Sequence, residues 1–234
     1  MKVIMRSKSK GRLFIDATPE QEQAFIEERR KFAFLAACRW PLSWLIQARR
    51  HKMAADILYE IAYDAYERDM TRSLAEFKDG LPGGSVSKTL EGQELIDNLK
   101  MDLLEDYLLL AGYALECVLK GCLLVMLPEL VNDEKRLDKV IVTHDLCQLC
   151  HDCALLLSPE ERELLDVITR YIVWGKYPGP LKLEDMPSWV DPEDQKTKSL
   201  SIGNLFHQRR VQSLVNGVFQ RGLDLLNNLR NSES

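Results

Sequence analysis

The sequence predicts an all-α protein. Several long stretches carry apolar residues at spacings of three and four, which place those residues on one face of a helix. Two of the stretches follow the helix-start sequences TPEQ at 18–21 and SPEE at 158–161. No stretch alternates apolar and polar residues over the length of a strand. We therefore expect an antiparallel helical bundle with an N-terminal helical extension.

The composition of the 234-residue chain is that of a soluble globular protein, with 46% hydrophobic and 29% charged residues. The most apolar run, LLLAGYALECVLKGCLLVML at 108–127, is broken by Glu116 and Lys120, so we expect no membrane span. The basic N-terminus lacks the features of a secretory signal, and six cysteines without such a signal suggest reduced thiols. A cytoplasmic location is the expectation.

The first two helices are defined by their ends. Thr18 can cap the first helix and Gln21 can close a capping box, and Pro41 requires that helix to end before it. A second amphipathic helix runs from about Ser43 to near Phe77. Its predicted apolar face consists of Ala54, Ile57, Leu58, Ile61, Ala62 and Ala65.

The stretch DGLPGGSVSKT at 79–89 is the clearest break in the first half of the chain. It has the outline of a phosphate-binding loop, but Ser87 and Pro82 occupy positions where that motif requires glycine. We therefore predict three regions: an N-terminal arm and helical extension at 1–80, a linker at 81–89 and a helical bundle at 90–234.

The second half of the chain supplies the rest of the predicted bundle. One helix is expected over 90–127, ended by Pro128, followed by a short helix after HDL at 144–146. The helix opened by SPEE continues to Trp174, with Gly175 as its stop. The predicted stripe of the first of these helices is Leu103, Leu104, Tyr107, Leu108, Ala111, Ala114, Leu115, Val118, Leu119, Cys122 and Met126.

The C-terminal end is predicted to be helical. Residues 176–203 contain four prolines and are expected to be mostly irregular. The last helix is expected over about 204–230. Its predicted inner face is Val211, Leu214, Val215, Val218, Leu225 and Leu226.

The segment HDLCQLCHDC at 144–153 contains residue types that bind zinc. On a helix, however, Cys150 and Cys153 join the leucine stripe while Cys147 and His151 stand on its flank. These side chains do not converge on one metal, so we expect neither a metal nor another cofactor.

The segments LLLAGYALECVLKGCLL, HDLCQLC and LLDVITRYIVWGKYP, in that order, resemble a HEPN domain, the helical nucleotide-binding domain of higher eukaryotes and prokaryotes. The resemblance covers about residues 100–230. It implies an antiparallel helical bundle, commonly a homodimer, associated with RNA cleavage or nucleotide binding in bacterial toxin and defence systems.

Catalytic members of this family carry Arg, four to six residues, then His, often with Tyr two positions later. Here Arg170 and Tyr177 match the outer positions, but Gly175 stands where the histidine belongs. The resemblance therefore implies a non-catalytic module that binds a nucleotide or RNA, since the general base is missing. The candidate ligand-binding residues are Arg170, Trp174, Lys176, Tyr177, Lys120 and His144.

These candidates have distinct chemical roles in this hypothesis. Arg170 and Lys176 would bind phosphate, whereas Trp174 and Tyr177 would stack on a base. Lys120 and His144 would be their neighbours if the bundle packs as in the family.

Three alternatives stay open from the sequence. The aromatic residues Tyr171, Trp174 and Tyr177 could belong to the core, with Arg170 on the surface. The protein could then be a helical dimerisation or interaction protein that binds no nucleotide. It could also be a ribonuclease with a substitute base such as His144 or His207.

Overall fold

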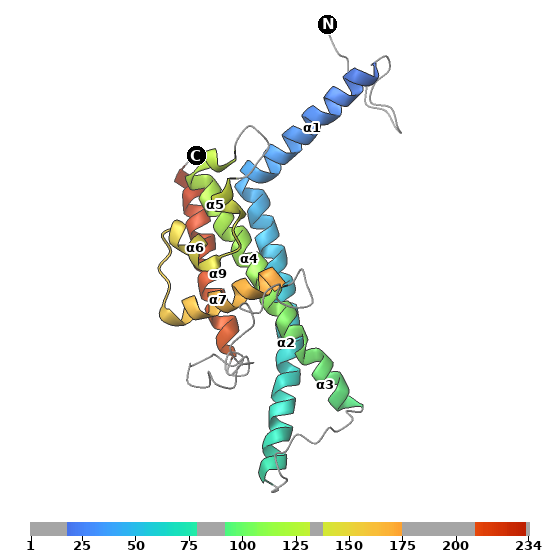
Figure 1. Cartoon of the computed structure of the whole chain (residues 1–234). Coiled ribbons are helices and arrows are strands. Elements are labelled where there is room, and N and C mark those ends of the chain that lie inside the picture. The colour runs from blue at the N-terminus through green and yellow to red at the C-terminus, as the bar shows by residue number, and fades with distance from the viewer. Residues whose placement is uncertain (1–17, 79–91, 132–137, 175–208, 233–234) are drawn as a thin grey trace, which may run out of the picture.

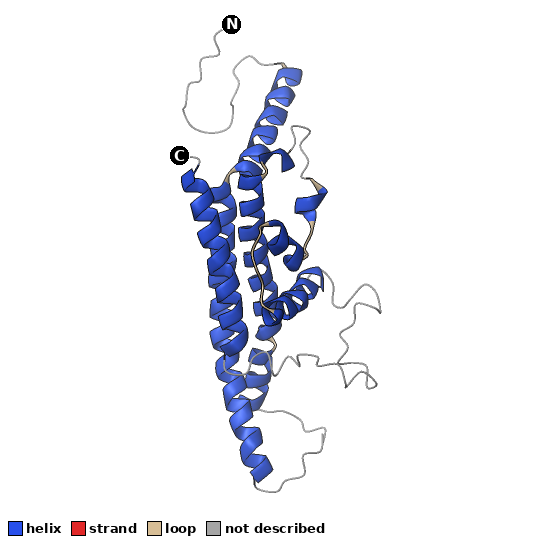
Figure 2. Cartoon of the chain, turned by 90° about the vertical axis from the view of Figure 1, so that its left-hand side faces the viewer, coloured by secondary structure: helices blue, strands red, loops and turns tan. Residues whose placement is uncertain are grey.

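The computed structural model describes residues 18–78, 92–131, 138–174 and 209–232, and every long element in these ranges is a helix (Figures 1 and 2). The predicted all-α class is confirmed. The elements are α1 (Pro19–Arg39), α2 (Pro41–Lys78), α3 (Gln93–Met101), α4 (Leu103–Met126), η1 (Pro128–Leu130), α5 (Lys139–Val142), α6 (Leu146–Asp152), α7 (Pro159–Trp174) and α9 (Arg210–Ser232).

Helix α4 is the centre of the bundle. It packs against α2, α9, α7 and α6, and its residues from Val118 to Val125 are all buried. The stretch Gln93–Met126 is the single one in the described ranges that is long and apolar enough for a membrane span. Because 67% of its most apolar window is buried inside the structure, it has the character of a core helix.

The long helices α2 and α9 run in opposite directions beside α4. Antiparallel α2 places Trp44 against Gly121 and, further along, the Tyr59 ring 4.8 Å from the Tyr107 ring. Helix α9 runs parallel to α4, because Gly222 faces Val118 and Leu226 lies one turn later beside Gly121. The three helices share one apolar core.

Both predicted capping boxes are present. The amide of Gln21 donates to Thr18 Oγ1 at 3.4 Å, and the amide of Thr18 donates to Gln21 Oε1 at 3.1 Å. At the start of α7, the amide of Ser158 donates to Glu161 Oε2 at 2.9 Å and the amide of Glu161 to Ser158 Oγ at 3.2 Å. These bonds satisfy helix N–H groups that have no partner within the helix.

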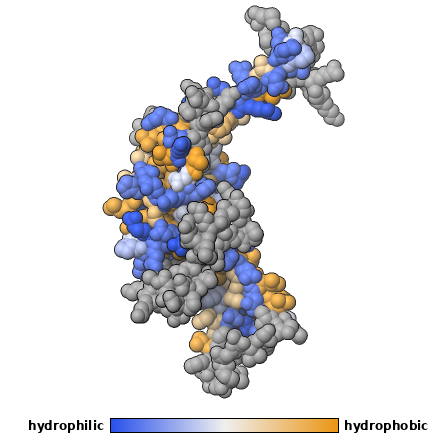
Figure 3. Space-filling view, in the orientation of Figure 1, coloured by the Kyte–Doolittle hydropathy of each residue, from blue (hydrophilic) through white to orange (hydrophobic). Residues whose placement is uncertain are grey.

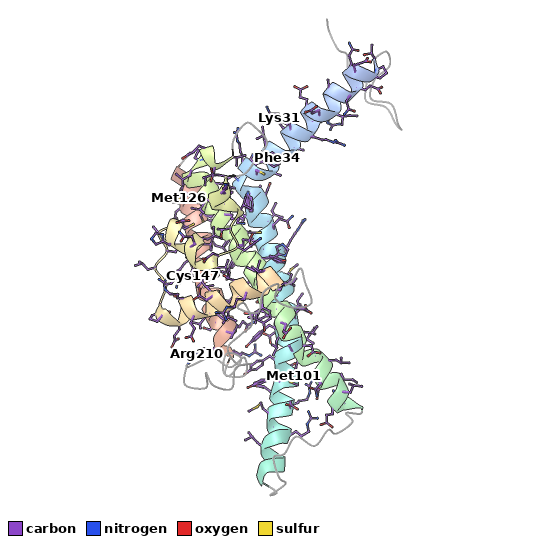
Figure 4. The ribbon with its side chains drawn as sticks, viewed as in Figure 1. Lys31, Phe34, Met101, Met126, Cys147 and Arg210 are labelled. Atoms are coloured by element: carbon purple, nitrogen blue, oxygen red, sulfur yellow. The ribbon has the colours of Figure 1, made fainter. Side chains whose placement is uncertain are left out.

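Helix α1 extends away from the body of the molecule (Figure 1), and it ends before Pro41 as predicted. Its surface is mostly hydrophilic in Figure 3, and Lys31, labelled in Figure 4, lies well outside the bundle. The end of α1 is attached to the body by a hydrogen bond from Arg39 Nη2 to the Val131 carbonyl at 2.8 Å.

The structure corrects the predicted apolar face of α2. Ile57 and Ile61 are 56% and 40% exposed, whereas Ala55 and Tyr59 are fully buried on the opposite side. The prediction was right for Ala62 and Ala65, which are fully buried, and wrong for Ile57 and Ile61. Helix α2 carries apolar residues on two sides, and spacing alone does not show which side other helices cover.

The helix predicted over 90–127 is two helices, since α3 ends at Met101 and α4 begins at Leu103. Nine of the eleven residues of the predicted α4 stripe are buried, whereas Leu103 is partly buried and Met126 is 39% exposed. The predicted linker at 81–89 and the predicted irregular segment at 176–203 lie outside the described residues.

Candidate functional site

A cluster of polar side chains interrupts the apolar surface of α4. Lys120 Nζ lies 2.6 Å from Glu116 Oε1, and His144 Nδ1 lies 2.9 Å from the other carboxylate oxygen, Glu116 Oε2. The side chains of Lys120, Glu116 and His144 are 7%, 13% and 35% exposed. One carboxylate thus joins a buried ammonium group to a partly exposed imidazole, and these three residues are called the Glu116 cluster below.

Local structure fixes the geometry of the Glu116 cluster. Glu116 and Lys120 are one turn apart on α4, with the acid nearer the N-terminus, the favourable order for such a pair. His144 precedes α6, where the amide of Asp145 donates to Thr143 Oγ1 at 3.1 Å. The Asp145 carboxylate in turn caps α6 by accepting from the amide of Gln148 at 2.9 Å. These bonds hold the backbone on both sides of His144.

Helix α2 adds His51 to the surroundings of the cluster. The His51 ring lies 5.6 Å from the Tyr113 ring on α4. Burial lowers the pKa of His51 below its usual 6.5, and the charge of Glu116 opposes this in part. Burial also raises the pKa of Cys117 to about 11, with a contribution from Glu116. The cluster therefore lies in a partly desolvated setting, with a neutral imidazole and a protonated thiol beside it.

The bond to Glu116 also determines which nitrogen of His144 is available. An ionised carboxylate only accepts hydrogen bonds, so Nδ1 of His144 must donate to it. In the neutral ring, Nε2 is then left with its lone pair, able to accept a hydrogen bond or a proton. This is the arrangement by which a carboxylate orients a histidine general base.

The structure places the six predicted ligand-binding residues as follows. Lys120 and His144 come together through Glu116. Arg170 is exposed on α7. Trp174 is the last residue of α7, and its side chain is not among those that the structure describes. Lys176 and Tyr177 lie outside the described residues, as do Gly175 and His207.

Helix α7 is nevertheless attached beside the cluster. The amide of Leu146 donates to Thr169 Oγ1 on α7 at 3.2 Å, which ties the residue before Arg170 to the chain two residues after His144. Tyr171, by contrast, is 7% exposed and belongs to the core, as one of the alternatives from the sequence proposed. The end of α7 thus presents Arg170 to solvent next to the start of α6.

Sequence reasoning did not select Glu116 or His51. The signal for Glu116 was present, because Glu116 and Lys120 are the only charged residues in the apolar run 108–127 and lie one turn apart. No comparable signal marks His51, which joins the site by helix packing alone.

The cysteine-rich segment does not form a converging set of ligands. Cys150 and Cys153 are buried, and Cys153 Sγ lies 3.4 Å from the Leu119 carbonyl. Cys147, labelled in Figure 4, lies between α6 and α7, with its sulfur 3.3 Å from Asp166 Oδ1. The His151 side chain is 83% exposed. Within the described ranges, no group of three or more histidine, cysteine or acidic side chains is arranged to hold a metal ion.

Burial also determines the protonation of these thiols. It is the main cause that raises the pKa of Cys147 and of Cys150 to about 12. Both therefore stay protonated near neutral pH, which makes them poor nucleophiles and poor metal ligands.

Comparison of the chain with protein-family models, with curated proteins and with solved structures gave no significant match.

Proposed function

We propose that the chain is a HEPN-like helical module that binds a phosphate-bearing ligand, a nucleotide or RNA, at the corner where α4, α6 and α7 meet. The observation that carries the proposal is the Glu116 cluster. It joins two of the candidate residues, Lys120 and His144, through one carboxylate at the edge of an apolar core.

Stability alone gives little reason for such a cluster. Desolvating an ion pair costs several kcal/mol per ion, and apolar residues of similar size often stabilise a core as well or better. Titratable groups perturbed by burial and by one another are typical of functional sites. His51, which lies beside the cluster, is a group of this kind, because burial lowers its pKa and the charge of Glu116 acts on it.

Arg170 is the cation best placed to bind phosphate. It is exposed, and the Thr169–Leu146 bond holds its helix beside His144. An arginine can bind a phosphate through two parallel hydrogen bonds. The charge of Lys120 is matched by Glu116, so Lys120 would position the carboxylate rather than bind phosphate directly. Lys176, Trp174 and Tyr177 remain proposed ligand contacts from the resemblance.

The test measures binding of a fluorescent single-stranded RNA by polarisation and of adenine nucleotides by calorimetry. A charge-assisted phosphate contact contributes about 1.5–3 kcal/mol to the free energy of binding. Arg170→Ala removes this contact and should therefore weaken binding about tenfold to hundredfold. Arg162→Ala is the control, because Arg162 is also exposed on α7, about two turns before Arg170.

Two results would reject this function. One is the absence of binding to RNA and to nucleotides by the wild type. The other is equal binding by the Arg170→Ala and Arg162→Ala proteins.

A ribonuclease with a substitute base is the second candidate, and the His144–Glu116 bond favours it. The free Nε2 of His144 could accept the proton of a ribose 2′-hydroxyl. The first proposal expects little or no RNA cleavage by the wild type, since Gly175 replaces the family histidine. Robust cleavage that is lost in His144→Gln and kept in His151→Gln would replace it with this second candidate.

A further inference from the structure

The imidazole of His144 is hydrogen-bonded through one of its two nitrogens. Nδ1 donates to Glu116 Oε2 at 2.9 Å, and within the described residues this is the only side-chain hydrogen bond that His144 makes. The side chain of His144 is 35% exposed, whereas that of Glu116 is 13% exposed. Because Nδ1 faces the more enclosed carboxylate, the exposed part of the ring lies on the side away from Nδ1, where Nε2 is. In the neutral ring, the lone pair of Nε2 is therefore accessible to a small molecule.

The bonds around His144 hold the ring in one orientation. Lys120 Nζ lies 2.6 Å from Glu116 Oε1, so both oxygens of the carboxylate are engaged. Two residues after His144, the amide of Leu146 donates to Thr169 Oγ1 on α7 at 3.2 Å. A histidine whose second nitrogen is oriented by a third group has the arrangement of a nucleophile in covalent catalysis, because little freedom is left to lose when the new bond forms.

His151, on α6, provides a comparison within the same molecule. Its Nδ1 lies 3.4 Å from Asp152 Oδ1, and its side chain is 83% exposed. This longer contact on a solvated surface holds the ring weakly, so either nitrogen can carry the proton. Exposure alone would therefore favour reactions at His151, whereas a fixed orientation and a single tautomer favour reactions at His144.

We propose that Nε2 of His144 is a phosphoacceptor, which takes a phosphoryl group from a small donor that carries this group on nitrogen. The Nε2 lone pair forms a bond to phosphorus, while the bond from phosphorus to the donor's nitrogen breaks and the leaving amine takes that electron pair. Nδ1 keeps its proton, so the ring gains a positive charge beside the Glu116 carboxylate, which stabilises the phosphorylated form.

The chemistry of the product explains the choice of donor. Phosphorylated imidazole has a phosphorus–nitrogen bond, so transfer from a donor with the same kind of bond exchanges one such bond for another. What the protein must then supply is positioning and charge, the two main contributions to catalysis of phosphoryl transfer. The Glu116 cluster supplies both to His144. The modification rests on this cluster but needs no bound nucleotide or RNA, so it goes beyond the proposed function.

Incubation of the full chain with phosphoramidate tests the proposal, with mass spectrometry of its peptides to locate the product and phosphorus NMR to identify the nitrogen. The wild type should gain a phosphoryl group on Nε2 of His144, about tenfold or more faster than His151 gains one. His144→Gln should lose this product and His151→Gln should keep it. An unmodified His144 in the wild type, or a faster reaction at His151, overturns the proposal, and this comparison requires no variant to fold.

A double variant tests the role of the carboxylate. Glu116→Gln with Lys120→Met removes the charge next to His144 without leaving an unpaired ammonium group in the core. An amide can accept from Nδ1 or donate to it, so both tautomers become possible and phosphorus NMR should show products on both nitrogens. The reaction at His144 should also be about tenfold slower or more. The same rate and a single Nε2 product, in a variant with unchanged far-UV circular dichroism, would overturn the proposal.

The outcome is separate from that of the binding experiments. If His144 is phosphorylated but the wild type binds neither RNA nor nucleotides, the proposed function is rejected and the phosphoacceptor site stands. If the wild type binds RNA through Arg170 but His144 does not react, the phosphoacceptor site is rejected and the proposed function stands.

Discussion

Helices α4 and α2 each carry a buried lysine paired with an acid one turn away, but the two pairs differ in their access to water. On α4, Lys120 and Glu116 have side chains that are 7% and 13% exposed. On α2, Lys52 is 10% exposed while its partner Asp56 is 41% exposed. The same sequence pattern thus gives an enclosed ion pair on α4 and a partly exposed ion pair on α2.

The largest predicted effect comes from breaking the enclosed pair. Glu116→Ala leaves the Lys120 ammonium without its partner in the core and should lower the free energy of unfolding by about 3–5 kcal/mol. Asp56→Ala should lower it by about 1 kcal/mol or less, because water can replace a carboxylate at an exposed position. Urea unfolding followed by circular dichroism measures both.

A second substitution serves as the control for this prediction. Lys120→Met in the Glu116→Ala background should recover most of the loss, since an apolar side chain then replaces the unpaired charge. Equal losses for Glu116→Ala and Asp56→Ala would show that the two helices do not differ in enclosure.

The same contrast explains how far the sequence could predict the fold. On α4 several neighbouring helices cover most of the surface, so nine of the eleven residues of the predicted stripe are buried. On α2 the spacing rule selected Ile57 and Ile61, although the core side contains Ala55 and Tyr59. Spacing reports where apolar residues recur, and burial depends on which face other helices cover.

The sequence analysis missed the break between α3 and α4 and the carboxylate of the Glu116 cluster, for different reasons. Asp102, between α3 and α4, is neither proline nor glycine, so no local signal marks the break. Lys120 and His144 were selected from the resemblance, but the carboxylate that joins them was not. His51 reaches Tyr113 through the packing of α2 on α4, a contact between residues 62 positions apart that local sequence does not encode.

An intermediate effect should come from adding a methyl group where α7 crosses α4. A Cβ atom at Gly112 would lie 2.6 Å from Ile172 Cγ1 and 2.8 Å from Ile168 Cγ2, which is too close for two carbon atoms. Gly112→Ala should therefore destabilise the protein by up to about 2 kcal/mol, since overpacking of about 1–3 kcal/mol exceeds the helix-propensity gain of about 1 kcal/mol.

Gly217→Ala on α9 is the matched control for Gly112→Ala. Its Cβ would lie 3.9 Å from Glu161 Oε1, an ordinary contact distance. This variant should be more stable than the wild type by about 0.5–1 kcal/mol, because alanine favours the helix. A Gly112→Ala protein as stable as Gly217→Ala would mean that α4 is less tightly enclosed than the structure indicates.

The smallest predicted effect concerns His51, which lies on α2 but faces α4. Because burial lowers its pKa below 6.5 in the folded state, the unfolded chain binds the proton first as the pH falls. The contribution of neutral His51 to stability is therefore complete above about pH 6.5 and is lost as the pH falls from there toward the folded-state pKa. Between pH 7.5 and 5.5, the wild type should lose up to about 2 °C more in Tm than His51→Gln, as measured by differential scanning fluorimetry.

His151→Gln should behave like the wild type, because the His151 side chain is 83% exposed. The charge of Glu116 acts in the opposite direction on His51, so the pH-dependent loss should become larger in a Glu116→Gln background. A loss that is the same in wild type and His51→Gln would show that the contact between α2 and α4 leaves this imidazole as hydrated as an exposed one.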